Sequence, residues 1–450
     1  METKNSFLSP FQKFIKIESF SGILLLFAAI AALIWANSPF AEGYTALQHY
    51  HLGYKSDRFE LNLSLLHWIN DGFMAVFFFL IGLEIKREFL IGELNSPKKL
   101  AFPLVGAIGG MVIPVVFFLI INKYFSGHAD ATLHGWGIPM ATDIAFSLAI
   151  LKVLGDRVPI SLKIFLTAFA IVDDLGAVIV IALFYTGTIK MVFLGVALGL
   201  LAILYFLSNK GYYSKFLMII FGIAIWILFL KSGVHPTLAG ILLAFSVPIR
   251  QKVDTSQFLS RLEEITTKIK GSSELKEPIL SAEQIHEIDE LQEWTYKYQS
   301  PLQNLEHHLH DWVAYFIIPI FALANSGVIL SSSEGLDFPL VLNIALCLLL
   351  GKSIGVSVFV LLANKLKIIS IPIDISKSQI IGVSFLAGIG FTMAIFIASL
   401  AFADQPKYID SAKIGILIGS SISGIIGYLL LKSQGSKVKQ NQDPDEVIIP

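Results

Sequence analysis

The chain is 450 residues long, with 55% apolar residues, only 15% charged residues and a mean hydropathy of +0.71. Soluble domains carry about a quarter charged residues, so the composition excludes an ordinary soluble protein and indicates a polytopic membrane protein. The net charge of −1, without a basic patch, gives no sign of a nucleic-acid partner, and the single cysteine excludes an intramolecular disulfide and a cysteine-based zinc site.

Long apolar runs predict about twelve membrane-spanning helices, because a helix needs about 20 residues to cross a bilayer. The first eight fall within residues 1–248 and the last four within 312–432, and residues 433–450 form a polar tail. The sequence therefore predicts an all-α polytopic membrane protein. The approximate spans are 19–37, 66–85, 103–121, 137–151, 164–185, 191–207, 216–230, 234–248, 312–330, 339–363, 378–402 and 414–431.

Two features lie near the start of the second span. Residues 39–65 are polar and aromatic without a long apolar run, which predicts a short hairpin or loop. Asp71 follows, and it is a candidate for an ion pathway between the two sides of the membrane. The alternative is an acid that only stabilises the helix N-terminus or lies at the membrane interface.

The fourth span is short and interrupted, because Gly135, Gly137 and Pro139 precede Thr142 and the isolated charge Asp143. The eleventh span carries a similar run of Gly382, Gly388, Gly390 and Thr392. These spans are the middle members of helices 3–5 and 10–12. Paired interruptions predict an inverted-topology repeat with two broken, crossing helices that form a binding site, although glycines also serve close helix packing.

Asp173 and Asp174 are the only charges in the apolar run from Ile164 to Tyr185. An aspartate at the bilayer centre costs roughly 2.5–3.5 kcal/mol on insertion scales, so such residues usually mark an ion or proton path. The alternative is a structural ion pair within the bundle. Adjacent residues point about 100° apart on a helix, so the two aspartates are expected to serve different partners.

Lys352 is the only charge within the tenth span. One carboxylate is expected to pair with it, which leaves other acids to bind a cation or protons. Crossed half-helices bring like helix ends together, each with about half a charge. Asp143 would neutralise the positive pair of ends and Lys352 the negative pair.

Residues 249–311 form the only substantial insertion between spans. Apolar residues recur there at helical spacing in two groups, which predicts two amphipathic helices. They are Phe258, Leu262, Ile265 and Ile269, and then Ile285, Ile288, Leu291, Trp294 and Tyr298. The pattern leaves open whether these helices pack on the membrane, on each other or on a partner.

The lysines and arginines between the spans predict the orientation of the chain. With both termini on one side, that side holds 25 of them against 7 on the other, or 18 against 7 without the long loop. The richer side marks the cytoplasm. Both termini and residues 249–311 are therefore predicted to be cytoplasmic.

Eight stretches, in their order and spacing, make the chain similar to the NhaA-type sodium/proton antiporters over nearly its whole length. They are INDGFMAVFFFLIGLEIKREF (69–89), GIPMATDIAFSL (137–148), FAIVDDLGAVIVIALFYT (169–186), LKSGVHPTLAGI (230–241), LEHHLHDWVAY (305–315), FALANSGV (321–328), GKSIG (351–355) and LAGIGFTMAIFI (386–397). The insertion before Leu305 is longer than in familiar members of that family.

The resemblance implies a role for each isolated charge. Asp173 and Asp174 would bind the transported sodium ion or protons, with Lys352 as salt-bridge partner. Thr142 and Asp143 would lie where the two broken helices cross, beside the glycines of the second break. A cytoplasmic pH-sensing cluster would consist of Glu84, Arg87, Glu88, Glu306, His307 and His310.

The expected function is electrogenic exchange of sodium, or lithium, for protons across a bacterial cytoplasmic (inner) membrane, with pH-dependent activity, no enzyme activity and no cofactor. The family also implies a homodimer in the lipid bilayer. Two rival classes of membrane protein would need other features. An intramembrane aspartyl protease needs a GxGD motif that the sequence lacks. A carrier of bile acids or other organic solutes needs a roomier and less charged site.

Overall fold

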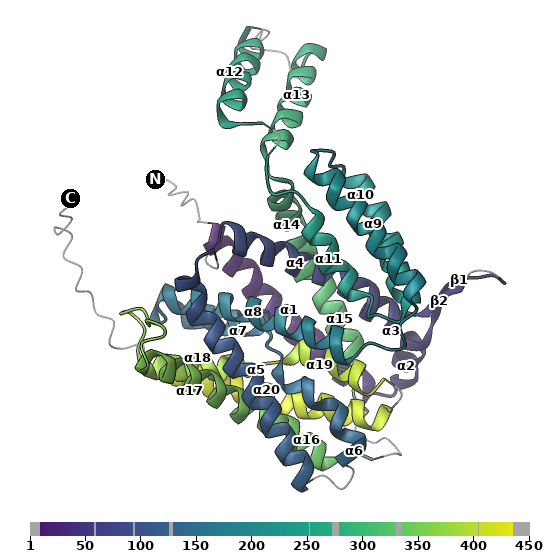
Figure 1. Cartoon of the computed structure of the whole chain (residues 1–450), viewed down its shortest axis with the longest axis vertical. Helices are drawn as coiled ribbons and strands as arrows, with labels where there is room; N and C mark the ends of the chain where they lie inside the picture. The colour runs from purple at the N-terminus through teal and green to yellow at the C-terminus, as the bar shows by residue number, and fades with distance from the viewer. Residues whose placement is uncertain are drawn as a thin grey trace. The chain divides into compact units, whose positions relative to one another are not determined.

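The computed structural model describes residues 10–57, 60–92, 95–125, 129–251, 253–271, 279–329, 335–403 and 405–434. The predicted tail beyond residue 434 and the connection at 272–278 lie outside these residues. The described chain is almost entirely helical (Figure 1). The exception is one antiparallel pair of strands, β1 (His51–Lys55) and β2 (Glu60–Ser64), in register from His51 opposite Ser64 to Lys55 opposite Glu60.

The chain divides into two compact units, and the first comprises residues 1–74, 88–187 and 313–450. It contains both strands and all five isolated charges that the sequence places at membrane depth, which are Asp71, Asp143, Asp173, Asp174 and Lys352. Its helices are α1 (Pro10–Ala36), α2 (Ala41–His49), α3 (Leu65–His67), η1 (Trp68–Phe73), α5 (Pro97–Phe125), α6 (Ala129–Thr132), η2 (Leu133–Met140), α7 (Ile144–Leu154), η3 (Gly155–Arg157), α8 (Ile160–Phe184), η4 (Val313–Ile317), α15 (Ile318–Asn325), α16 (Phe338–Leu346), η5 (Cys347–Gly351), α17 (Lys352–Lys365), α18 (Lys377–Ala387), α19 (Phe391–Ala401) and α20 (Pro406–Gln434).

The second unit comprises residues 75–87 and 188–312. Its buried core includes Phe79, Leu83, Met218 and Leu302. Its helices are most of α4 (Met74–Leu90), α9 (Met191–Asn209), α10 (Lys215–Ser232), α11 (Thr237–Ser246), α12 (Thr255–Gly271), α13 (Ala282–Tyr298) and α14 (Pro301–Trp312).

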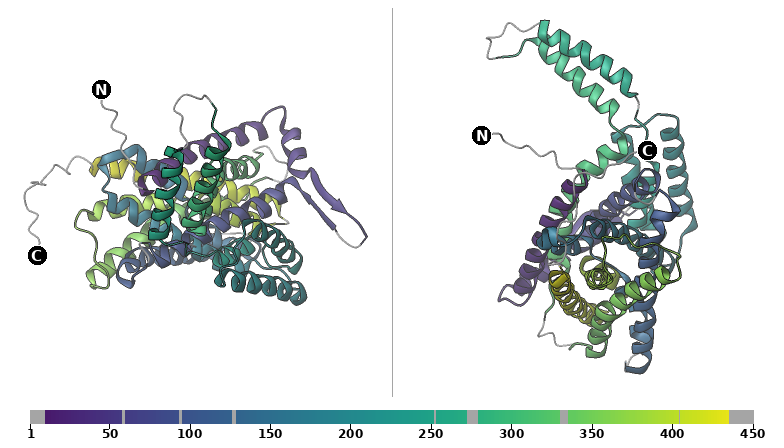
Figure 2. Two further views of the ribbon diagram at one scale, coloured as in Figure 1. Left: turned by 90° about the horizontal axis from the view of Figure 1, so that it is seen from above. Right: turned by 90° about the vertical axis from the view of Figure 1, so that its left-hand side faces the viewer.

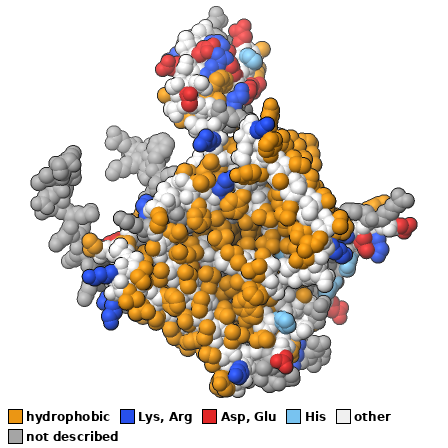
Figure 3. Space-filling view, viewed as in Figure 1, with side chains coloured by type: hydrophobic (Ala, Val, Ile, Leu, Met, Phe, Trp, Pro, Cys, Tyr) orange, Lys and Arg blue, Asp and Glu red, His pale blue; other side chains and the backbone are white. Residues whose placement is uncertain are grey.

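Within the described residues, seven helices are long and apolar enough to cross a membrane, or ten if each of three bent helix pairs counts as one span. The helices in the predicted span 234–248 and at the end of 312–330 are shorter, since α11 has 10 residues and α15 has 8. The structure therefore agrees with a polytopic helical membrane protein but does not establish twelve spans. Apolar side chains cover most of the face shown in Figure 3.

Close helix packing in the first unit depends on glycine where α5 meets α17. A Cβ atom on Gly109 would lie 2.4 Å from the carbonyl oxygen of Gly355, and one on Gly355 would lie 2.2 Å from that of Gly109. Only glycine permits such an approach of two backbones. The contact holds the helix that begins at Lys352 against α5.

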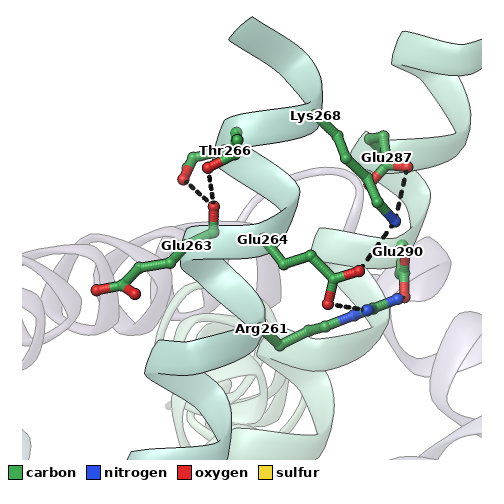
Figure 4. A network of polar contacts seen from close by, with 8 residues as sticks. Arg261, Glu263, Glu264, Thr266, Lys268, Glu287 and Glu290 are labelled. Carbon is green, nitrogen blue, oxygen red and sulfur yellow. Dashed lines mark hydrogen bonds and ion pairs between the residues drawn. The ribbon is translucent and has the colours of Figure 1, made fainter. Parts of the chain in front are cut away.

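In the 249–311 segment, α12 and α13 pack on each other as a hairpin, side by side in both views of Figure 2. The segment also contains most of a third helix, α14, where the sequence pattern predicted only two. Arg261 on α12 forms an ion pair with Glu290 on α13, and Lys268 Nζ lies 3.5 Å from Glu287 Oε1 (Figure 4). Phe258 and Tyr298 stack at 4.3 Å between ring centroids. Of the three packing arrangements that the sequence left open, the structure has the second, helix on helix.

Candidate ion-binding site

Two adjacent aspartates lie in the middle of α8, a helix of 25 residues with apolar side chains on either side of them. Asp173 is fully buried and Asp174 is 6% exposed. Thr142, in the unwound segment before α7, lies close to the carboxylate of Asp173. The helix thus holds two carboxylates in a nearly dry interior, where an ionised carboxylate is stable only with a compensating positive charge.

Lys352 supplies that positive charge from α17. Its Nζ lies 2.8 Å from Asp173 Oδ2, and both side chains are 0% exposed. The same ammonium also donates to the carbonyl oxygen of Met140, and it lies close enough to Asp174 for the two charges to interact. A π-helical segment, η5, directly precedes Lys352; such turns insert one residue and change the direction of the side chains that follow.

Both interrupted spans are broken where the glycine and threonine runs were found, and the two breaks meet. The helix axes bend by 42° between η2 and α7 and by 43° between α18 and α19. The backbone N–H of Asp143 donates to the carbonyl of Ile389 at 2.6 Å. A Cβ atom on Gly390 would lie 2.7 Å from the carbonyl oxygen of Ala141, and one on Gly388 would lie 2.5 Å from that of Leu348, so the crossing needs glycine at both positions.

Asp143 caps two helices at once. Its Oδ1 accepts from the backbone N–H of Phe146 at 3.1 Å, which caps the N-terminus of α7. Its Oδ2 accepts from the backbone N–H and the hydroxyl of Thr392 at 3.0 and 2.7 Å, at the N-terminus of α19. Because both helix starts are positive, one carboxylate balances the facing pair, as the charge pattern led us to expect.

The facing C-terminal ends are stabilised differently from the expectation. Lys352 serves only the end of η2, at Met140. At the end of α18 the carbonyls accept from hydroxyls instead: Thr142 donates to Ala387 at 3.0 Å and Ser147 to Leu386 at 2.8 Å. Two serines of α20 complete the crossing, since Ser423 donates to the Phe385 carbonyl at 2.6 Å and Ser420 accepts from the Gly390 N–H at 3.2 Å.

The exact position of the first break differs from the interruption seen in the sequence. Gly135, Gly137 and Pro139 lie inside the 3₁₀ helix η2, and the chain unwinds only at 141–143. Gly382 likewise lies inside α18, where a Cβ atom would lie 2.8 Å from Leu431. Glycine therefore marks close packing at these positions and a break only at Gly388 and Gly390.

Asp71 lies in the π-helical segment η1 and is partly buried. Its neighbour Asn70 exchanges amide hydrogen bonds with Asn325 of α15, at 2.8 and 3.2 Å. The Asn70–Asn325 pair was not predicted from the sequence.

The expected pH-sensing residues lie on α4 and α14, and two cross-helix pairs connect those helices. Glu84 Oε1 lies 3.7 Å from His310 Nδ1, with both side chains about nine-tenths buried, and Arg87 Nε lies 3.3 Å from Glu306 Oε1. Glu88 and His307 each follow a paired residue and so point about 100° away on their helices. The ring of His307 lies 5.7 Å from that of His308, between centroids.

Comparisons with known proteins agree with this geometry. A model of the family named Na+/H+ antiporter 1 matches residues 12–431. A Na+/H+ antiporter NhaA of Oleidesulfovibrio alaskensis is 46% identical over 94% of this chain and 94% of its own length. The relative NhaA 1 of Saccharophagus degradans is 43% identical over 96% and 93%. The relative of Helicobacter pylori is 43% identical over 96% and 97%.

A match of this length and identity, on a helical chain with two broken helices that meet beside buried carboxylates, establishes the family. The chain belongs to the Na+/H+ antiporter 1 family of multi-pass membrane transporters.

Proposed function

We propose that the protein exchanges sodium, or lithium, for protons at Asp173 and Asp174, and that this exchange is electrogenic. The observation that carries the proposal is the charge inventory beside the crossing: two carboxylates of α8 and the single ammonium of Lys352. One positive charge balances only one of the two negative charges. A sodium ion or a proton is therefore needed to neutralise the remaining carboxylate in the low-dielectric interior.

Competition between the two cargoes follows from the same chemistry. A carboxylate binds a hard cation through its oxygens, and a proton occupies those same oxygens. When Lys352 holds Asp173, Asp174 is the carboxylate that alternates between proton and cation. When a cation recruits both carboxylates, Asp174 gives up its proton and the Lys352 contact is released. The ammonium of Lys352, buried without its partner, gives up a second proton, so two protons leave the site for each cation that binds. That stoichiometry makes the exchange electrogenic.

The test is sodium-driven proton movement in reconstituted vesicles, followed with a pH-sensitive dye. Asp174→Asn is expected to abolish the signal, because an amide neither loses a proton nor offers a charged ligand. Asp337→Asn is the matched control. Asp337 is also buried, and its carboxylate caps α16 by accepting from the Leu340 N–H at 2.9 Å, a role that asparagine fills equally well. Exchange that persists in Asp174→Asn at equal protein level would contradict the proposal.

We further propose that the pairs between α4 and α14 make the exchange pH-dependent. Histidine is the side chain whose ordinary pKa lies near neutral pH. Protonation of His310 converts its contact with the Glu84 carboxylate into an ion pair. Because α4 and α14 are bridged twice, a change in the charge of one pair alters how tightly the two helices are held.

The proposed location is a bacterial cytoplasmic (inner) membrane, with both termini and residues 249–311 in the cytoplasm and the protein as a homodimer. The excess of lysine and arginine on one side supports this orientation. A reporter that is active only in the periplasm is expected to stay inactive when fused after Lys432. An active reporter at that position would reverse the orientation.

A further inference from the structure

A groove of about 1060 Å³ runs between α1, α7, α19 and α20 in the first unit. Its lining is apolar apart from two serines and Tyr428 on α20. The open rim is well exposed, with Ile30 on α1 at 47%, Ile425 at 59% and Leu429 at 55%. The helix α20 is long and apolar enough to span a membrane, so the groove opens toward the surrounding lipid rather than toward water.

The floor of the groove is part of the second helix break. Ile389 and Phe391, on either side of Gly390, line it and are 3% and 4% exposed. The carbonyl of Ile389 accepts the backbone N–H of Asp143 at 2.6 Å. Phe391 packs edge-to-face on Phe146 of α7, with centroids 5.3 Å apart. A molecule in the groove therefore contacts Ile389, which accepts a hydrogen bond from Asp143. It also contacts Phe391, which directly precedes Thr392, a donor to the Asp143 carboxylate.

The groove has the length and the charge expected of a phospholipid site. Its α20 wall runs from Leu417 to Leu429, about 18 Å at 1.5 Å per residue, close to the roughly 15 Å depth of one leaflet. One turn beyond Leu429 stands exposed Lys432, with its Nζ 5.4 Å from the ring centroid of Tyr428. A cationic side chain at this end of the groove suits a phosphate.

We propose that this groove binds one phospholipid molecule. Its acyl chain lies along α20 and packs against Ile389 and Phe391, and its phosphate lies at Lys432. The hydrophobic effect cannot select this lipid over its neighbours, because lipid tails are as apolar as the groove. Retention depends instead on packing in the groove and on the charge at Lys432. The bound chain supports the second break from outside.

The first test is photocrosslinking with a phospholipid that carries a photoreactive acyl chain, in vesicles that contain the intact protein. Crosslinked peptides are expected from the groove walls of α1 and α20. Ser421→Trp places a large ring in the groove and is expected to abolish these crosslinks. Ala202→Trp makes the same change at an exposed position of α9 outside the groove and is expected to leave them intact. Ile30→Trp fills the groove from α1 and serves if Ser421→Trp does not fold.

Several results would overturn the proposal. Equal crosslinking in Ser421→Trp and Ala202→Trp would exclude the groove as the site. Crosslinks between two copies of the protein would show that a second chain covers this face. Unchanged crosslinking in Lys432→Gln would show that the lipid phosphate does not depend on Lys432. None of these measurements requires transport, so their outcome does not depend on the proposed function.

A second measurement addresses the contact with the break, and it rests on the proposed exchange of sodium for protons. Ser421→Trp is expected to change the rate of sodium-driven proton movement relative to Ala202→Trp, in vesicles with equal protein. Identical rates would show that the occupant of the groove does not act on the break.

Discussion

Lys352 and Asp173 pair with both side chains fully buried, whereas Arg261 and Glu290 pair on the α12–α13 hairpin with 26% and 18% of their side chains exposed. Removing two charges from water costs several kcal/mol per ion even after relaxation, and the attraction between them repays this cost only with additional hydrogen bonds. An exposed pair avoids most of that cost and gains little. The buried pair is thus a poor device for stability, and its presence points to ion chemistry.

The largest effect is expected when one partner of the buried pair is removed. Lys352→Met leaves Asp173 buried without its ammonium, which should destabilise the protein by about 3–5 kcal/mol. The measurement is thermal unfolding in detergent. Lys365→Met, an exposed lysine at the end of the same helix, is the control and should leave the unfolding temperature unchanged.

Adding Asp173→Asn to Lys352→Met removes the stranded charge, so the double variant should regain much of the lost stability. It should not regain exchange. A double variant that is as unstable as Lys352→Met would show that packing around the lysine stem, rather than the ion pair, sets the stability of this region.

Asp143→Asn is expected to have an intermediate effect, because the two oxygens of Asp143 serve two different helix ends. Asparagine offers one acceptor, so the amide N–H₂ meets an N–H donor at the other end. The cost of one unsatisfied buried donor is about 1–3 kcal/mol. Exchange should be slowed but retained, since polar neighbours still surround both helix ends. Complete loss of exchange in a folded Asp143→Asn protein would assign Asp143 a direct part in ion binding.

The sequence predicts the central charges well because charge in a membrane is rare and expensive. That cost led us to expect that Lys352 pairs with one aspartate, and the partial charges at helix ends led us to expect Asp143 at the positive ends of crossed helices. The structure has both contacts. The positions of the two helix breaks were predicted only to within a few residues, because glycine occurs both in unwound backbone and at close helix packing.

The hydroxyl groups at the crossing were not predicted. Thr392, Ser147, Ser420 and Ser423 each satisfy a backbone or carboxylate group of another helix. Serine and threonine are common in membrane helices, and they bond within their own helix as readily as across to another. Their partners therefore depend on which helices meet. The one local signal was Thr392, which stands two residues after Gly390 and so at the start of the helix that follows.

A smaller effect is expected from the pairs between α4 and α14 in the second unit. Replacing Glu306, His307 and His310 together should shift the pH dependence of exchange without abolishing it, because Asp173, Asp174 and Lys352 remain in place. His308→Gln is the control: His308 lies on the same helix, is exposed and bonds only to the carbonyl of Asn304. The readout is the exchange rate as a function of pH. Coinciding profiles for the triple variant and the unmodified protein would remove the sensor assignment.

The smallest effect is expected for Arg261→Ala, because Arg261 and Glu290 form the more exposed of the two ion pairs compared above. Arg261 holds the pKa of Glu290 and of Glu264 below the ordinary value of 4.5, so these pairs add stability above that pH and lose it as the pH falls below it. The variant should increase proteolysis of α12 and α13 at neutral pH and leave exchange unchanged. High salt should reproduce this effect in the unmodified protein.

Lys297→Ala is the control, because its ion pair with Glu293 stays within one helix and does not connect the hairpin. Slower exchange in Arg261→Ala but not in Lys297→Ala would show that the hairpin affects transport.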